Sequence, residues 1–76
     1  MSLFWLTYKN GKEITVFIQP AASLVHARLK GALAGCDDGT FAEGHELDTK
    51  TGKKIPKTQL EKPLSQKEAK RLLDRL

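Results

Sequence analysis

The chain has 76 residues, of which 39% are hydrophobic and 29% are charged, and it carries a formal net charge of +4 at pH 7. A chain of this length leaves room for one core only, because such a domain buries only about 60% of the surface that its unfolded chain exposes. The ordinary composition excludes a disordered chain, and no apolar run approaches the roughly 20 residues of a bilayer-spanning helix. We therefore expect a single domain over residues 1–76 with no membrane association.

The N-terminal segment is predicted to be a strand and not a signal peptide. Its apolar run, residues 3–6, has no basic stretch ahead of it, and no small-residue cleavage site follows. The single cysteine, Cys36, cannot form an intramolecular disulfide, so the stability of the domain must come from packing. A reducing compartment is the simpler expectation, and the predicted localisation is cytoplasmic.

Residues 3–8 and 13–18 are predicted to form a β-hairpin. Both segments are dominated by β-branched and aromatic residues, and Asn10-Gly11 between them favours the positive φ angles of a type I′ turn. A turn centred on these two residues places Trp5 opposite Val16. Both faces of the hairpin are then apolar.

Pro20 is predicted to end the second strand, since it has no N–H to give to the sheet, and to introduce the first helix. Gly35 is predicted to end that helix. Apolar residues recur along it at helical spacing, and we expect this stripe to face the core. The stripe consists of Ala22, Val25, Leu29, Ala32 and Leu33.

A turn over residues 36–39 is expected to lead into a strand over residues 40–47, and residues 48–52 to form a second turn. Residues 53–60 are predicted to return as a strand, which Pro56 restricts to a sheet edge or a bulge. Ser65 and Glu68 have the spacing of a capping box and predict the start of the last helix.

The predicted fold class is α+β. The elements follow in the order ββαββα, and the simplest arrangement is a four-stranded antiparallel sheet with two helices packed on one face.

No catalytic or metal-binding motif stands out, and we expect a non-enzymatic protein without a cofactor or a small-molecule substrate. The acids of residues 37–48, together with His45, match neither the calcium-loop spacing nor the zinc pattern. Cys36 follows a predicted helix C-terminus, where the helix dipole disfavours the thiolate.

Charge is unevenly distributed along the second half of the chain, and its basic residues are one candidate site. Residues 35–48 contain acids but no Lys or Arg, whereas residues 49–64 contain five lysines and one acid. If the basic side chains converge they suit phosphate groups, although lysines also serve solubility and protect sheet edges. The candidate phosphate or nucleic-acid contacts are Lys50, Lys53, Lys54, Lys57, Lys67, Lys70, Arg71 and Arg75.

The second candidate site is the hairpin face that two helices on one side would leave uncovered. An aromatic sheet face stacks unpaired bases or pairs with another protein surface, unless one helix packs on each side. The candidate interface residues are Phe4, Leu6, Tyr8 and Phe17. The leading functional hypothesis is a non-catalytic domain that associates with itself or with a protein partner through its sheet. The alternative hypothesis is a nucleic-acid-binding domain that uses the basic residues.

Overall fold

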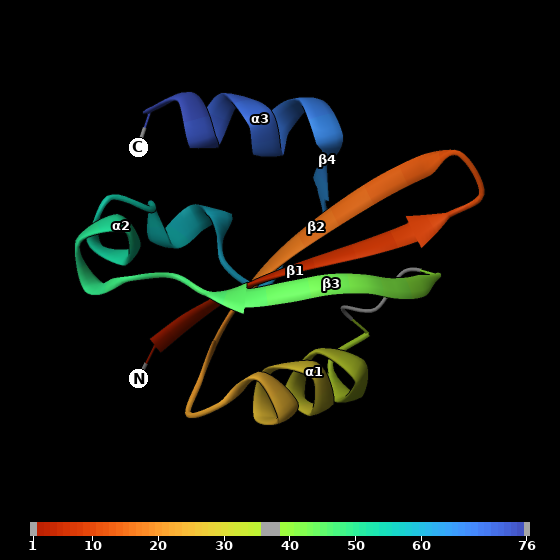
Figure 1. The fold of residues 1–76 in the computed structure, drawn as a ribbon, viewed down its shortest axis with the longest axis horizontal. Coiled ribbons are helices and arrows are strands. Elements are labelled where there is room, and N and C mark those ends of the chain that lie inside the picture. Colours follow the sequence, from red (N-terminus) through yellow and green to blue (C-terminus); the bar gives the residue numbers. More distant parts are fainter. Residues whose placement is uncertain (1, 36–38, 76) are drawn as a thin grey trace.

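A hairpin of two long strands forms the centre of the structure, a computed structural model that describes residues 2–35 and 39–75. β1 (Ser2–Asn10) and β2 (Glu13–Ala21) pair antiparallel along their whole length (Figure 1). The predicted hairpin is confirmed, and both strands extend beyond the predicted segments.

The hairpin turn lies one residue further along the chain than predicted. The pairing leaves Gly11 and Lys12 as the two central residues. Gly11 has a φ of 64° and Lys12 has no positive φ, which fits a type II′ turn and not the predicted type I′ turn. Trp5 consequently lies opposite Ile18 instead of Val16. Because side chains alternate between faces with a period of two, this two-residue shift leaves every side chain on its predicted face.

β2 continues through Pro20 to Ala21, so the prediction that Pro20 ends the strand is wrong. The carbonyl of Ile18 accepts a hydrogen bond from the backbone N–H of Glu61, on the side of β2 that faces away from β1. Pro20 lies two residues later and has the same orientation, so its missing N–H removes no bond to β1.

The sheet contains four antiparallel strands in the order β3-β1-β2-β4, which confirms the predicted α+β class and the four-stranded sheet. β3 (Thr40–Glu46) coincides with the strand predicted over residues 40–47, one residue shorter, and pairs with β1. β4 is only Leu64–Ser65 and pairs with β2. The turn predicted over residues 36–39 falls mainly on residues 36–38, which lie outside the described residues.

Residues 48–60 contain two short helices instead of the predicted turn and strand. α2 (Thr49–Lys53) begins where the Asp48 side chain accepts a hydrogen bond of 2.6 Å from the backbone N–H of Thr51. The 3₁₀ helix η1 (Lys57–Gln59) follows Pro56. The predicted strand over residues 53–60 is therefore wrong, and the fourth strand forms further along the chain.

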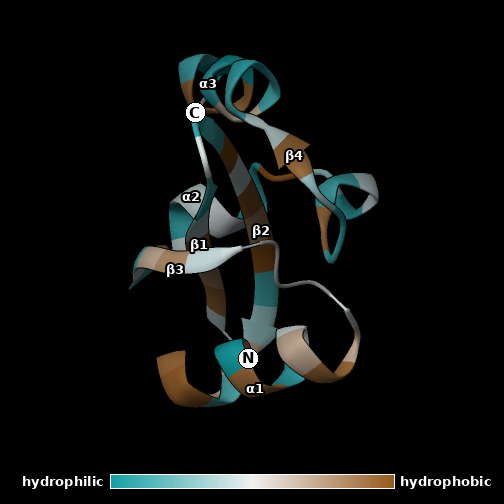
Figure 2. Cartoon of the chain, turned by 90° about the vertical axis from the view of Figure 1, so that its right-hand side faces the viewer, coloured by the Kyte–Doolittle hydropathy of each residue, from teal (hydrophilic) through white to brown (hydrophobic). Residues whose placement is uncertain are grey.

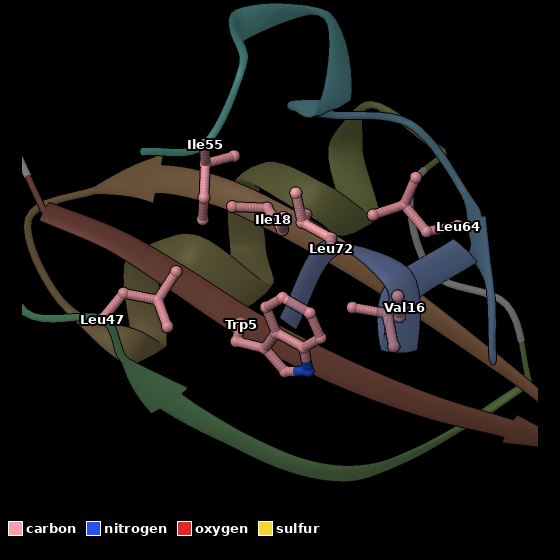
Figure 3. Packing of buried hydrophobic residues seen from close by; sticks show 8 residues of the cluster. Trp5, Val16, Ile18, Leu47, Ile55, Leu64 and Leu72 are labelled. Carbon is pink, nitrogen blue, oxygen red and sulfur yellow. The ribbon is translucent and has the colours of Figure 1, made fainter. Parts of the chain in front are cut away.

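The first and last helices lie on opposite faces of the sheet, which differs from the predicted placement on one face (Figure 1). α1 (Leu24–Leu33) covers a core that contains Phe4, Leu6, Tyr8, Phe17, Ala21 and Ala27. α3 (Gln66–Arg75) and the segment around α2 cover the other core (Figure 3). That second core contains Trp5, Val16, Ile18, Leu47, Ile55, Leu64, Ala69 and Leu72. Since both faces of the hairpin are apolar, each face needs its own cover.

The predicted capping box at the start of α3 is confirmed. The backbone N–H of Glu68 donates to the Ser65 hydroxyl at 3.1 Å, and the Glu68 carboxylate accepts from the N–H of Ser65 at 3.5 Å. The helix then buries Ala69 and Leu72 against the sheet. Gly35, with a φ of 76°, follows the end of α1 as predicted.

Candidate interaction surfaces

The outer side of α1 carries three of the four large apolar side chains that are exposed among the described residues. The helix begins at Ser23, whose hydroxyl accepts from the backbone N–H of His26 at 3.2 Å. Val25 is 73% exposed, Leu29 56% and Leu33 81%. In Figure 2, α1 lies at the bottom of the view, and brown hydrophobic stretches alternate with teal hydrophilic ones along it. We define the outer face of α1 by the exposed apolar residues Val25, Leu29, Ala32 and Leu33 of the helix, together with Ala22 just before it.

The predicted orientation of α1 is therefore wrong, because the stripe that was expected to face the core faces solvent. The residues that α1 buries are Ala27 and Gly31, with Leu24 packed against the core at lower burial. Small residues let a helix lie close to a sheet that already presents large aromatic side chains. The bulkier stripe then has to lie on the other side, since the two sets are roughly half a helical turn apart.

Two shallow hollows flank the outer face of α1. One, of about 400 Å³, lies toward β3 and includes Val25, Leu29 and Phe41 in its lining. The other, of about 230 Å³, lies toward the end of β2 and includes Ala22, Leu29 and Leu33. Leu29 borders both, so the helix forms an apolar ridge between two depressions.

Two cations border this ridge, one on each side. The guanidinium of Arg28 lies 4.0 Å from the centre of the Phe41 ring, a cation–π contact on the β3 side. Lys30 donates a hydrogen bond of 2.8 Å from Nζ to the carbonyl of Pro20 on the β2 side. Both contacts hold the charged groups at the sides of the ridge, so the centre of the outer face is uncharged.

The predicted sheet interface is covered by α1. Phe4, Leu6, Tyr8 and Phe17 are all buried within the single chain, where they form the core beneath α1. The Tyr8 ring makes edge-to-face contacts with Phe17 and Phe41, with ring centres 5.6 Å and 5.5 Å apart. These four residues act as core in this structure, because a helix packs on each side of the sheet.

The predicted basic residues are all exposed, and the structure brings some of them together. Arg71 and Arg75, one helical turn apart on α3, line a hollow of about 150 Å³ with Pro56 and Gln59 at the two ends of η1. Lys57 is the first residue of η1, so it belongs to the same region. Glu68 lines the same hollow and partly offsets its charge.

The other basic candidates spread over different parts of the molecule. Lys50 and Lys53 lie on α2, Lys54 caps its end, and Lys53 lines a separate hollow of about 280 Å³ with Leu3 and Leu47. Lys67 and Lys70 lie on α3 outside the hollow that Arg71 and Arg75 share.

Within residues 2–35 and 39–75, no group of three or more metal-ligating side chains comes together. Asp48 has a pKa below its usual value because its carboxylate accepts hydrogen bonds from Thr51, so it serves as a helix cap. Cys36, Asp37 and Asp38 lie outside the described residues. No helix in the described part of the chain has the length and apolar character to cross a bilayer.

The fold and these surfaces define a small α+β domain with a helix on each face of a four-stranded antiparallel sheet. Comparisons with protein-family models, curated proteins and solved structures gave no match to this chain.

Proposed function

We propose that this chain is a non-catalytic interaction domain that binds protein through the outer face of α1. The observation that carries the proposal is the exposure of Val25, Leu29 and Leu33 along one side of a helix whose opposite side is already packed. α1 therefore has apolar residues on two opposite sides, and the hydrophobic effect favours the burial of both. A contiguous apolar patch on a small domain is typical of a protein contact site.

The proposal replaces the sheet with the helix as the contact surface. Association through Phe4, Leu6, Tyr8 and Phe17 requires α1 to leave the sheet, whereas association through the outer face of α1 requires no rearrangement. Binding that preserves the backbone of the free protein is the common case for preorganised domains.

Single substitutions to aspartate on the outer face test the proposal. Leu29→Asp and Leu33→Asp place a charge in the patch and should abolish association, while the fold is retained because both side chains are exposed. Leu73→Asp on α3, where the leucine is also about half exposed, is the matched control and should leave association unchanged.

Two quantities are measured for each variant. The first is the solution mass by light scattering up to high micromolar concentration, and the second is the amount of protein that the immobilised variant captures. Circular dichroism checks that each variant is folded. If Leu29→Asp and Leu33→Asp neither lower the mass nor reduce captured protein relative to Leu73→Asp, the outer face of α1 is not the contact surface.

Nucleic-acid binding is the second candidate function, and the convergence of Arg71 and Arg75 beside η1 favours it. Two arginines one turn apart, with Lys57 on the neighbouring segment, present several donors to phosphate oxygens. Affinity for an oligonucleotide should then fall steeply with salt as counterions are released.

Titration with single- and double-stranded oligonucleotides at two salt concentrations tests this second function. The variant Arg71→Glu combined with Arg75→Glu should remove binding, while Lys67→Glu, on the same helix outside the hollow, should change it less. Absence of binding at low salt excludes the function.

A further inference from the structure

Among residues 2–35 and 39–75, the charged side chains that line the hollows beside the outer face of α1 are all of one sign. Arg28 contributes to the hollow on the β3 side and Lys30 to the hollow on the β2 side. No Asp or Glu that the structure describes lines either hollow, and the helix itself, Leu24–Leu33, contains no acid. In the described part of the chain, the apolar ridge is thus bordered on both sides by positive charge.

The shape of this surface suits a helix as the occupant. Val25, Leu29 and Leu33 follow one another at intervals of four residues and form the kind of ridge that helices use to pack against each other. The hollows on either side of Leu29 provide grooves for the side chains of a second helix. An amphipathic helix laid along such a ridge and its grooves is a common mode of peptide recognition.

A second copy of the chain meets an electrostatic difficulty at this surface. In a two-fold dimer with antiparallel α1 helices, each flank faces the same flank of the other copy, so Lys30 faces Lys30 and Arg28 faces Arg28. With parallel helices the flanks are exchanged, and Lys30 faces Arg28. Both symmetric arrangements bring cations together next to an apolar contact, where like charges are costly.

We infer that the outer face of α1 binds an amphipathic helical segment of another protein whose apolar stripe is flanked by aspartates or glutamates. The inference rests on the proposed function and deepens it by giving the partner's chemistry. Acids beside the stripe pair with Arg28 and Lys30 on the two flanks, while apolar side chains cover Leu29 and its neighbours.

Three fluorescein-labelled helical peptides test the inference by anisotropy with the full chain. The first has a leucine stripe flanked by glutamates, the second has the same stripe flanked by lysines, and the third has the composition of the first with the stripe scrambled. The glutamate-flanked peptide should bind roughly fivefold or more tightly than the lysine-flanked peptide, as expected for two exposed ion pairs exchanged for repulsions. The scrambled peptide should not bind.

Charge-reversal and face variants identify the surface that binds. Lys30→Glu should reduce or reverse the preference for the glutamate-flanked peptide, and Arg28→Glu should act in the same direction. Leu29→Asp should abolish binding of that peptide, and Leu73→Asp should leave it unchanged. Raising the salt concentration should lower the preference between the two peptides, because exposed charges are screened.

Several outcomes overturn the inference. Equal binding of the two leucine-stripe peptides, or a preference for lysine flanks, refutes the acidic partner but leaves the contact surface intact if Leu29→Asp still abolishes binding. A Leu29-dependent dimer without peptide binding shows that a second copy occupies the face. Binding to vesicles of phosphatidylserine and phosphatidylcholine, with no peptide binding, shows that an anionic lipid surface does. Failure of all these probes, with no effect of Leu29→Asp on association, refutes the proposed function as well.

Discussion

The orientation of α1 predicts a large loss of stability for one leucine-to-alanine substitution and almost none for another. Leu6 is 0% exposed beneath α1, whereas Leu33 on the helix itself is 81% exposed. Truncating a fully buried leucine costs about 2–5 kcal/mol, because the transfer free energy is lost and a cavity remains. For a domain of this size, whose whole stability is of the order of 4–11 kcal/mol, Leu6→Ala should remove a large part of the free energy of unfolding.

Leu33→Ala should have almost no effect on stability. Full burial of a leucine contributes about 1.5–3 kcal/mol, and with 81% of Leu33 exposed only about a fifth of this, ~0.5 kcal/mol, is at stake. The slightly better helix propensity of alanine offsets part of that loss.

Urea unfolding followed by the fluorescence of Trp5, which is buried in the other core, measures both variants against the parent chain. The urea concentrations at half-unfolding should differ clearly between the two variants, while the dependence of the unfolding free energy on urea concentration should be the same. If Leu33→Ala proves as destabilising as Leu6→Ala, the helix has its apolar stripe against the sheet and the orientation described above is refuted.

Three further predictions concern the caps and the core. Ser65→Ala removes the hydroxyl that accepts from the N–H of Glu68 and should lower the free energy of unfolding by about 0.5–2 kcal/mol, measured by urea denaturation; an unchanged midpoint contradicts the cap. Hydrogen bonds from Thr51 lower the pKa of Asp48 in the folded state. The stabilisation of the folded state by this carboxylate should therefore be fully present above the pKa of Asp48 in the unfolded chain, and it should be lost as the pH falls through the folded-state pKa. Thermal melts between pH 6 and pH 2 should therefore show a smaller acid-dependent loss for Asp48→Asn than for the parent chain, and identical pH profiles contradict the cap at α2. Gln19 is buried and its side-chain Nε2 has no hydrogen-bond partner among the described residues, so Gln19→Met should leave stability unchanged or raise it by about 1 kcal/mol; a loss of more than that contradicts the unsatisfied amide.

The hairpin and the last helix could be predicted from the sequence because local chemistry determines them. Runs of β-branched and aromatic residues on both sides of Gly11 specify two strands, and each side chain keeps its predicted face although the turn is displaced by one residue. Ser65 and Glu68 specify a helix start through contacts within four residues. Such signals do not depend on the rest of the fold.

The orientation of α1 depends on its tertiary environment and could not be predicted from periodicity. A helix with small residues on one side and large apolar residues on the other has two candidate inner faces, and hydropathy favours the larger residues. The face that packs is the one that fits, since Phe4, Leu6 and Phe17 leave room only for residues such as Ala27 and Gly31. The apolar character of both hairpin faces was the available signal that each face needs a helix.

The residues around α2 were mispredicted for a different reason. Residues 53–60 have no clear alternation of polar and apolar side chains, and a proline such as Pro56 is also found in edge strands, so local signals did not exclude a strand there. Asp48 is a favoured N-cap residue, and local reasoning could have used it to predict a helix that begins at Thr49. The basic side chains on this segment and on α3 are exposed, but only the three-dimensional structure places Arg71 and Arg75 beside η1.

α1 has small residues toward the sheet and larger apolar residues on its outer face, so the docking of the helix is connected with the binding of a partner to that face. Ala27 and Gly31 contribute little apolar area to the inner contact, so the helix is held mainly by Leu24 and by side chains of the sheet. The larger side chains Val25, Leu29 and Leu33 are exposed, so the burial of their apolar surface stabilises the protein only when a partner covers them. A partner that binds the docked helix, and not the undocked one, stabilises the docked state by mass action. Binding at the outer face is thus coupled to protection of the aromatic core beneath α1, because one helix separates the two.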